Sequence, residues 1–323
     1  MKKEAGIFAL LVVLCIVVAV RNPAFLSATN LQNNARLIGL YGVFSIGLGL
    51  VIITGGIDLS VGSVFALLGV VLSILIVDRG WPGPLAALTV IAGSTVLGGL
   101  HGLLITRVRL QPFIVTLCGL LFYRGVARFI AGDETKGFGS EQSFGGLKTF
   151  ATGSVLGVPM PLVLLVVVSL VMGFVLHRSV YGRHLFAVGR SEEAARYAGV
   201  PSRQVIATAY VLSGLLAGIS GVILAFYTNS VSPSSHGNFY ELYGIAAAVL
   251  GGCSLRGGEG SIIGILIGTA LLIVLRNLVN LLGIPSSLDF AVMGAVILAG
   301  VAADELFKRR QAASAKAASA KGR

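Results

Sequence analysis

The sequence is poor in charged residues, cysteine and histidine. Only 11% of its 323 residues are charged, whereas a soluble globular protein carries about 25%, so the chain cannot cover itself against water and its solvent is mostly lipid. Its three cysteines lie far apart in apolar runs and its four histidines are scattered, which argues against a disulfide framework and a metal site. No Gly-Lys pair occurs, so the phosphate-binding loop of nucleotide-hydrolysing proteins is absent. No nucleophile lies near a base, and we expect no catalytic residue.

What the chain has instead is apolar length. Hydrophobic residues make up 55% of it, and its mean hydropathy is +0.93. About 20 apolar helical residues cross a membrane. The apolar runs are 5–20, 35–53, 60–77, 84–106, 113–131, 161–177, 205–227, 240–253, 260–280 and 286–303. Because lipid-exposed backbone must satisfy its own hydrogen bonds, the runs predict an all-α polytopic membrane protein with about ten transmembrane helices (eight to ten), some of them broken.

The net charge of +11 is compatible with nucleic-acid binding or with the cytoplasmic excess of Lys and Arg in membrane proteins. No aromatic-interleaved basic patch is present, so we expect no nucleic-acid partner. If the N-terminus is cytoplasmic and all ten runs cross, sixteen of the 24 basic residues lie inside, five outside and three in spans. This predicts a transmembrane domain over 1–307, cytoplasmic termini, a cytoplasmic loop at 178–204 and a disordered basic tail over 308–323.

A polar break interrupts the apolar residues after 53. Gly55 and Gly56 permit backbone angles that end a helix, and Asp58 or Ser60 can cap the next one. One interpretation is a tight turn with an N-cap. The other, compatible with the first, is a broken helix whose polar groups, including Thr54, line a path through the membrane.

A second glycine cluster resembles the first in sequence. Gly251 and Gly252 precede Gly257 and Gly258, and the chain then enters another apolar helix. We expect these glycines, with those of the first break, to form hinges on the same side of the membrane. This similarity indicates a parallel internal repeat of the kind found in transporters, although chance is an alternative in a chain with 44 glycines.

The internal loop contains a short helix with both ends marked. Ser191 is a suitable N-cap, Glu192 and Glu193 fall in the first turn, where the helix dipole favours negative charge, and Gly199 suits the end. Glu192 and Arg196 are four apart and can pair, while Ala194 and Ala195 belong to a small-residue face. A two-turn helix has little stability alone. It is therefore either an amphipathic connector at the membrane surface or a docking element.

Polar residues also occur inside later spans. Asn277 and Asn280 share a helix face, where their amides either bind solute hydroxyls or join neighbouring helices. Arg124 and Arg128 share a face near the outer end of a span, and we expect both to extend to the interface.

At these motifs the chain resembles the permease subunits of bacterial ATP-binding-cassette importers for monosaccharides of the ribose, xylose, arabinose and galactose type. The matching stretches are ITGGIDLSVGSVFAL from Ile53, GRHLFAVGRSEEAARYAGV from Gly182, ELYGIAAAVLGGCSLRGGEGS from Glu241 and GAVILAGV from Gly294. They extend over nearly the whole chain.

The resemblance implies import of a pentose, hexose or deoxysugar through the cytoplasmic (inner) membrane by alternating access. It implies a second permease copy or paralogue, a periplasmic or lipid-anchored sugar-binding protein, and a cytoplasmic ATPase that carries ATP and Mg and binds residues 191–199 as a coupling helix. This chain itself then needs no cofactor. It departs from the family at Tyr243-Gly244, at 286–290 and at Met293, so the sugar is not specified. The alternatives are a stand-alone secondary transporter or channel for a small polar solute, and a membrane scaffold.

Overall fold

The computed structural model describes residues 2–139 and 144–285, and six further positions between 288 and 298. Of the predicted span 286–303, only those six positions are described, and the predicted tail over 308–323 lies outside the described residues.

Helices dominate the described residues, and the two small sheets are two-stranded and antiparallel. In chain order the elements are α1 (Lys2–Arg21), η1 (Pro23–Leu26), α2 (Ala28–Ile53), α3 (Val61–Ser73), η2 (Ile74–Asp78), α4 (Gly83–Thr106), α5 (Pro112–Ala131), β1 (Lys136–Gly137), α6 (Gly145–Thr152), β2 (Ser154–Val155), β3 (Val158–Pro159), α7 (Met160–His177), α8 (Val180–Arg190), α9 (Glu192–Tyr197), α10 (Ser202–Thr228), β4 (Ser230–Val231), α11 (Tyr240–Leu250) and α12 (Ile262–Leu281).

The predicted all-α polytopic membrane fold is confirmed, but the number of spans is not. Seven helical segments in the described chain are long and apolar enough to cross a membrane: α2, α3 with η2, α4, α5, α7, α10 and α12. The apolar parts of α1 and α11 are shorter. With 11 residues, α11 is about 16 Å long, roughly half the thickness of the hydrocarbon layer.

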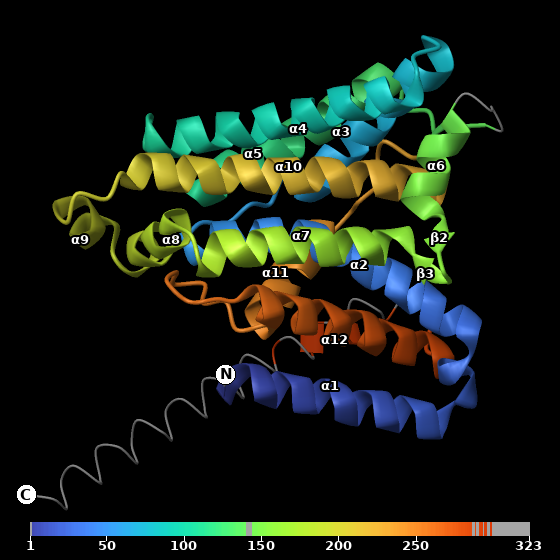
Figure 1. The fold of residues 1–323 in the computed structure, drawn as a ribbon. Coiled ribbons are helices and arrows are strands. Elements are labelled where there is room, and N and C mark those ends of the chain that lie inside the picture. Colours follow the sequence, from blue (N-terminus) through green and yellow to red (C-terminus); the bar gives the residue numbers. More distant parts are fainter. Residues whose placement is uncertain are drawn as a thin grey trace, which may run out of the picture.

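The long helices lie side by side in one bundle (Figure 1). Helix α9 lies at one end of it and α6 at the other, and we call these the α9 end and the α6 end. Helices α2 and α10 are central, because 83% and 78% of their most apolar windows are buried within the chain, against 28% for both α5 and α7. The outer helices thus present apolar faces suited to lipid or to another membrane chain.

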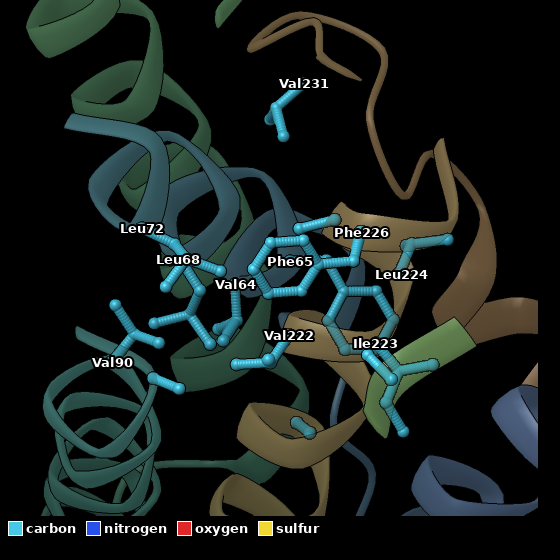
Figure 2. Close-up of a cluster of buried hydrophobic side chains, with 14 of the residues drawn as sticks. Val64, Phe65, Leu68, Leu72, Val90, Val222, Ile223, Leu224, Phe226 and Val231 are labelled. Atoms are coloured by element: carbon cyan, nitrogen blue, oxygen red, sulfur yellow. The ribbon is translucent and has the colours of Figure 1, made fainter. Parts of the chain in front are cut away.

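Part of the hydrophobic core lies where α3 meets α10. Phe65 and Leu68 of α3 pack with Val222 and Phe226 of α10, and Val231 lies above them (Figure 2). Close backbone approach holds α10 against α4 as well. There the Ser94 hydroxyl donates to the Gly214 carbonyl over 2.6 Å, an example of the small-residue contacts typical of membrane helix pairs.

Two breaks interrupt the bundle. The first, residues 54–60, returns the chain from the α9 end into the bundle, where α3 begins. The second, residues 229–239, enters from the α6 end and leads to the start of α11. Helices α3 and α11 therefore begin inside the bundle and run to opposite ends of it (Figure 1).

Candidate translocation and coupling site

The first break begins with a glycine turn that closes α2. Thr54 is the C-cap, and Gly55 has φ +81°. The Gly55 N–H donates to the Ile52 carbonyl over 2.8 Å, and the Gly56 N–H donates to the Val51 carbonyl over 3.1 Å. This pair of bonds is the Schellman motif. It explains why glycine stands at a position that needs a left-handed backbone.

The second glycine cluster closes α11 in the same way. Gly251 is the C-cap and Gly252 has φ +95°. The Gly252 N–H donates to the Val249 carbonyl and the Cys253 N–H to the Ala248 carbonyl, each over 2.9 Å. The two hinges thus share their local structure: in each, the left-handed glycine directly follows the C-cap residue, as the first glycine of the pair in one hinge (Gly55) and the second in the other (Gly252). This similarity is compatible with the predicted repeat.

The two hinges also touch each other and the end of α8. The Gly258 N–H donates to the Ile53 carbonyl over 2.8 Å. A Cβ on Gly257 would lie 2.5 Å from the Gly189 carbonyl oxygen and 2.9 Å from the Gly55 nitrogen. We call Gly55, Gly189, Gly257 and Gly258 the glycine junction. Gly189 is a member that sequence reasoning did not single out, since it lies within a helix at no diagnostic spacing.

Asp58 is buried, with 4% of its surface exposed. Its Oδ1 accepts hydrogen bonds from the Ser60 N–H (3.0 Å) and the Ser60 hydroxyl (2.7 Å), and its Oδ2 accepts one from the Ser213 hydroxyl of α10 (3.4 Å). Ser60 is the N-cap of α3, but its own side chain makes no cap bond. Asp58 therefore organises the tight turn that leads into α3, but neither Asp58 nor Ser60 caps that helix through its side chain, so the predicted turn is present and the predicted side-chain N-cap is not.

The predicted short helix in the internal loop is confirmed as α9. The Ser191 hydroxyl accepts from the Ala194 N–H over 3.2 Å, and Gly199 has φ +84°. Ala195 is buried against the bundle, whereas both first-turn glutamates are exposed. Helix α9 is thus attached through a small apolar contact and presents its charged face outward.

One predicted contact within α9 is wrong. The four-residue spacing predicts an ion pair between Glu192 and Arg196, but none joins these two described residues. The Arg196 guanidinium lies instead 5.9 Å from the centre of the Tyr197 ring. Exposed pairs gain little free energy over hydration, so the aromatic contact in the last turn competes successfully.

A cavity of about 880 Å³ opens beside α9. It is lined by the first hinge, the connection between α4 and α5, α9, and the start of α10. Its lining includes residues that were predicted for the path, for a hinge and for coupling to the ATPase. They are Thr54, Gly55, Gly56, Glu192, Glu193 and Arg196. It also includes Arg109, Arg203 and Tyr210, which sequence reasoning did not assign to a site. The cavity places the first hinge and α9 around a single space.

The two predicted path residues on α12 lie far from that cavity. Asn277 forms a reciprocal amide pair with Asn30 at the start of α2, with distances of 2.7 and 3.1 Å. Asn280 is exposed. Asn30 and Thr54 are at opposite ends of α2, about 36 Å apart along its axis. The structure therefore does not bring the five predicted path residues into one site.

The expectation for Arg124 is wrong. Its Nη1 donates to the carbonyls of Pro233 (3.2 Å) and His236 (2.7 Å), and its Nη2 donates to the Gly62 carbonyl (3.3 Å). It therefore points into the bundle rather than toward an interface, because the second break leaves the Pro233 and His236 carbonyls there without helical partners. These partners lie more than 60 residues away in sequence, so no local signal could reveal them.

Arg128, four residues on, does reach the surface. It binds the exposed Asp133 carboxylate, with 2.9 Å between Nε and Oδ1. The hydrogen bond from Arg128 holds the pKa of Asp133 below its usual value.

Two other titratable groups outside the spans are shielded from water: Cys253 is buried and Tyr181 is half-buried. Burial raises the pKa of the Cys253 thiol to about 12, so this thiol stays protonated at neutral pH and is a poor nucleophile. Burial also raises the pKa of Tyr181. Among the residues that the structure describes, no group of three His, Cys, Asp or Glu side chains could hold a metal ion.

The described chain forms a bundle of membrane-length helices with two internal breaks, glycine hinges and a large cavity at one end. This architecture suits a membrane permease better than a simple anchor. The comparison with known families agrees. Residues 30–301 match the family described as branched-chain amino acid transport system / permease component, and the chain belongs to this permease family.

Individual relatives cover most of both chains. The ribose import permease protein RbsC of Bacillus subtilis is 38% identical over 94% of this chain and 92% of that protein. RbsC of Escherichia coli K12 is 36% identical, with 94% and 93% covered. The xylose transport system permease protein XylH of Escherichia coli K12 is 31% identical, with 89% and 87% covered. No solved structure matches the chain.

Proposed function

We propose that the chain is the permease subunit of an ATP-binding-cassette importer that brings a monosaccharide into the cytoplasm. The observation that carries this proposal is its 38% identity, over 94% of its length, to a protein named as a ribose import permease. The family description mentions branched-chain amino acids, but the relatives quoted above are named for ribose and xylose, and these individual matches favour a sugar.

The orientation follows from charge. The loop 178–204 at the α9 end contributes Arg178, Arg183, Arg190, Arg196 and Arg203, and cytoplasmic loops carry the excess of basic residues. The α9 end then faces the cytoplasm and the α6 end faces the periplasm. Because α1 starts at the α9 end (Figure 1), the N-terminus is cytoplasmic in this arrangement, and an even number of spans makes the C-terminus cytoplasmic too.

The partners follow from the two ends. The exposed acidic turn of α9 suits a cytoplasmic ATPase subunit, which carries ATP and Mg, since this chain has no phosphate-binding loop. The α6 end suits a periplasmic or lipid-anchored sugar-binding protein. The apolar outer faces suit lipid and a second permease copy or paralogue. ATP binding closes the ATPase pair, and the motion passes through α9 to the glycine junction and opens the path outward.

Reconstitution tests this function directly. The chain should be purified with candidate ATPase and sugar-binding subunits and placed in proteoliposomes. We expect ATP-dependent uptake of at least one of ribose, xylose, arabinose and galactose, with leucine and valine as competing candidates. Uptake of an amino acid alone would refute the sugar assignment. Uptake without the ATPase, driven by an ion gradient, would favour a secondary transporter.

Alanine substitutions test the proposed path residues. If Asn277 and Asn280 contact sugar hydroxyls, Asn277→Ala and Asn280→Ala should each raise KM severalfold, because one hydrogen bond contributes about 1 kcal/mol. Asp58→Ala should chiefly lower the maximal rate, since it releases the turn into α3. Asn30→Ala is the matched control for the amide pair. Unchanged KM for both Asn277 and Asn280 variants would remove them from the path, and equal effects of Asn30→Ala and Asn277→Ala would assign the pair to helix packing.

A further inference from the structure

We propose that Arg124 is a positioning residue for transport. In this proposal it holds residues 231–239, which we call the gate segment, closed against the first turns of α3, and the gate segment leaves α3 when the path opens. The inference rests on the proposed transport function and concerns the second break, to which neither the sequence motifs nor the coupling model assigns a role.

The gate segment enters the bundle as non-helical backbone. Gly237, with φ +70°, packs against Gly62, where a Cβ on either glycine would overlap the other's carbonyl oxygen. Gly62 lies in the first turn of α3, and α3 with η2 extends more than about 20 Å from there to the α6 end. The segment therefore lies at membrane depth. Irregular backbone is tolerated at that depth only where protein buries it or where it lines water.

The gate segment is partly buried by protein and partly exposed. Ser234, Ser235 and Asn238 are exposed, whereas Pro233 and His236 are buried. Exposed polar side chains at membrane depth indicate a surface that faces an aqueous path or another protein chain. Hydroxyl and amide groups of this kind also suit a sugar.

Apart from Val231, which packs in the hydrophobic core, and Gly237, which packs on Gly62, the contacts that hold the segment are polar. Arg124 of α5 donates to the Pro233, His236 and Gly62 carbonyls, and so joins the gate segment to the start of α3. Glu241, in the first turn of α11, is buried; its carboxylate lies against Gly62 and interacts electrostatically with Arg124. The converging N-terminal ends of α3 and α11 and the Arg124 guanidinium offset part of the desolvation of this carboxylate.

The composition of residues 232–238 means that their release from α3 costs little free energy. The seven residues SPSSHGN between Val231 and Phe239 include no apolar side chain larger than proline, so little hydrophobic burial is lost when they move. The buried Nε2 of His236 also has no hydrogen-bond partner among the described residues. Buried polar atoms normally have one, and an open gate would give this nitrogen access to water or solute. These features distinguish the segment from a rigidly packed loop.

The first experiment loosens the gate. In proteoliposomes with the ATPase and binding protein, Arg124→Gln should reduce ATP-driven uptake at least tenfold and raise ATP-independent leak of the same sugar severalfold. Arg124→Lys should restore part of the coupled uptake, since a lysine can still donate to one or two of the carbonyls. Arg128→Gln is the matched control: it lies on the same helix face but binds the exposed Asp133, and it should change neither quantity. A well-folded Arg124→Gln variant without added leak would overturn the proposal.

The second experiment fixes the gate and does not depend on the stability of Arg124 variants. A Cβ on Gly69 of α3 would lie 3.6 Å from the Cβ of Val231, within the range of about 3.5–4.5 Å that a disulfide spans. In a background with Cys15, Cys118 and Cys253 replaced by serine or alanine, oxidised Gly69→Cys/Val231→Cys should lose at least nine-tenths of its uptake, and a reductant should restore it.

The outcomes distinguish failure of the gate proposal from failure of the proposed transport function. Equal uptake by the oxidised and reduced double-cysteine variant, with the cross-link verified by mass spectrometry, would overturn the gate and leave the proposed function intact. Absence of ATP-driven uptake by the unmodified complex would refute the proposed function and the gate together.

Discussion

Glu193→Lys is expected to reduce ATP-driven sugar uptake at least tenfold without affecting the fold of the permease. Glu193 is exposed in the first turn of α9, and no hydrogen bond or ion pair links its side chain to another described residue. Its replacement therefore costs the isolated chain little. A partner that recognises the acidic turn would instead meet a like charge, which costs binding energy and disturbs docking.

The measurements are copurification with the ATPase, ATP hydrolysis by the complex and uptake in proteoliposomes. We expect either loss of the complex or hydrolysis that no longer drives uptake, and Glu192→Lys should act in the same direction. Glu134→Lys is the matched control, because Glu134 is exposed but follows α5 at the α6 end. If Glu193→Lys leaves assembly and coupled uptake unchanged, or if Glu134→Lys impairs ATPase binding equally, α9 is not the coupling element.

Features with local causes were predictable from the sequence. The N-cap hydroxyl of Ser191 and the left-handed Gly199 marked both ends of α9, because caps act within one helical turn. The glycine pairs at 55–56 and 251–252 likewise marked the ends of α2 and α11, since a Schellman motif requires a left-handed residue at a fixed position.

Features with distant causes were not predictable. The seven residues 232–238 have the composition of an exposed turn, and only their packing on Gly62 places them inside the bundle. Arg124 belongs to an apolar helix, where an arginine ordinarily extends to the interface. Its direction depends on three carbonyls from distant parts of the chain, two of them in the second break. Asn277 could bind either solute or a helix, and its pairing with Asn30 became visible only in three dimensions.

The glycine junction provides the second large expected effect. At Gly257 an alanine must adopt φ near +84°, which costs about 1–2 kcal/mol in a left-handed conformation. Its Cβ would also lie 2.5 Å from the Gly189 carbonyl oxygen, so α8 must move away from the second hinge. We expect Gly257→Ala to lower the melting temperature of the purified protein and to abolish coupled uptake.

Gly252→Ala is the control that distinguishes backbone strain from steric overlap at the glycine junction. Gly252 has φ +95°, so alanine is strained there too, but no atom lies within 4 Å of its Cβ position. Both variants bear a comparable backbone cost, and only Gly257→Ala forces the hinges and α8 apart. A markedly larger loss of uptake for Gly257→Ala, measured at equal amounts of folded protein, would show that motion from α9 reaches α3 and α12 through this junction. Equal losses would assign the effect to local strain, and α9 would then have to act on the path through the residues around the 880 Å³ cavity.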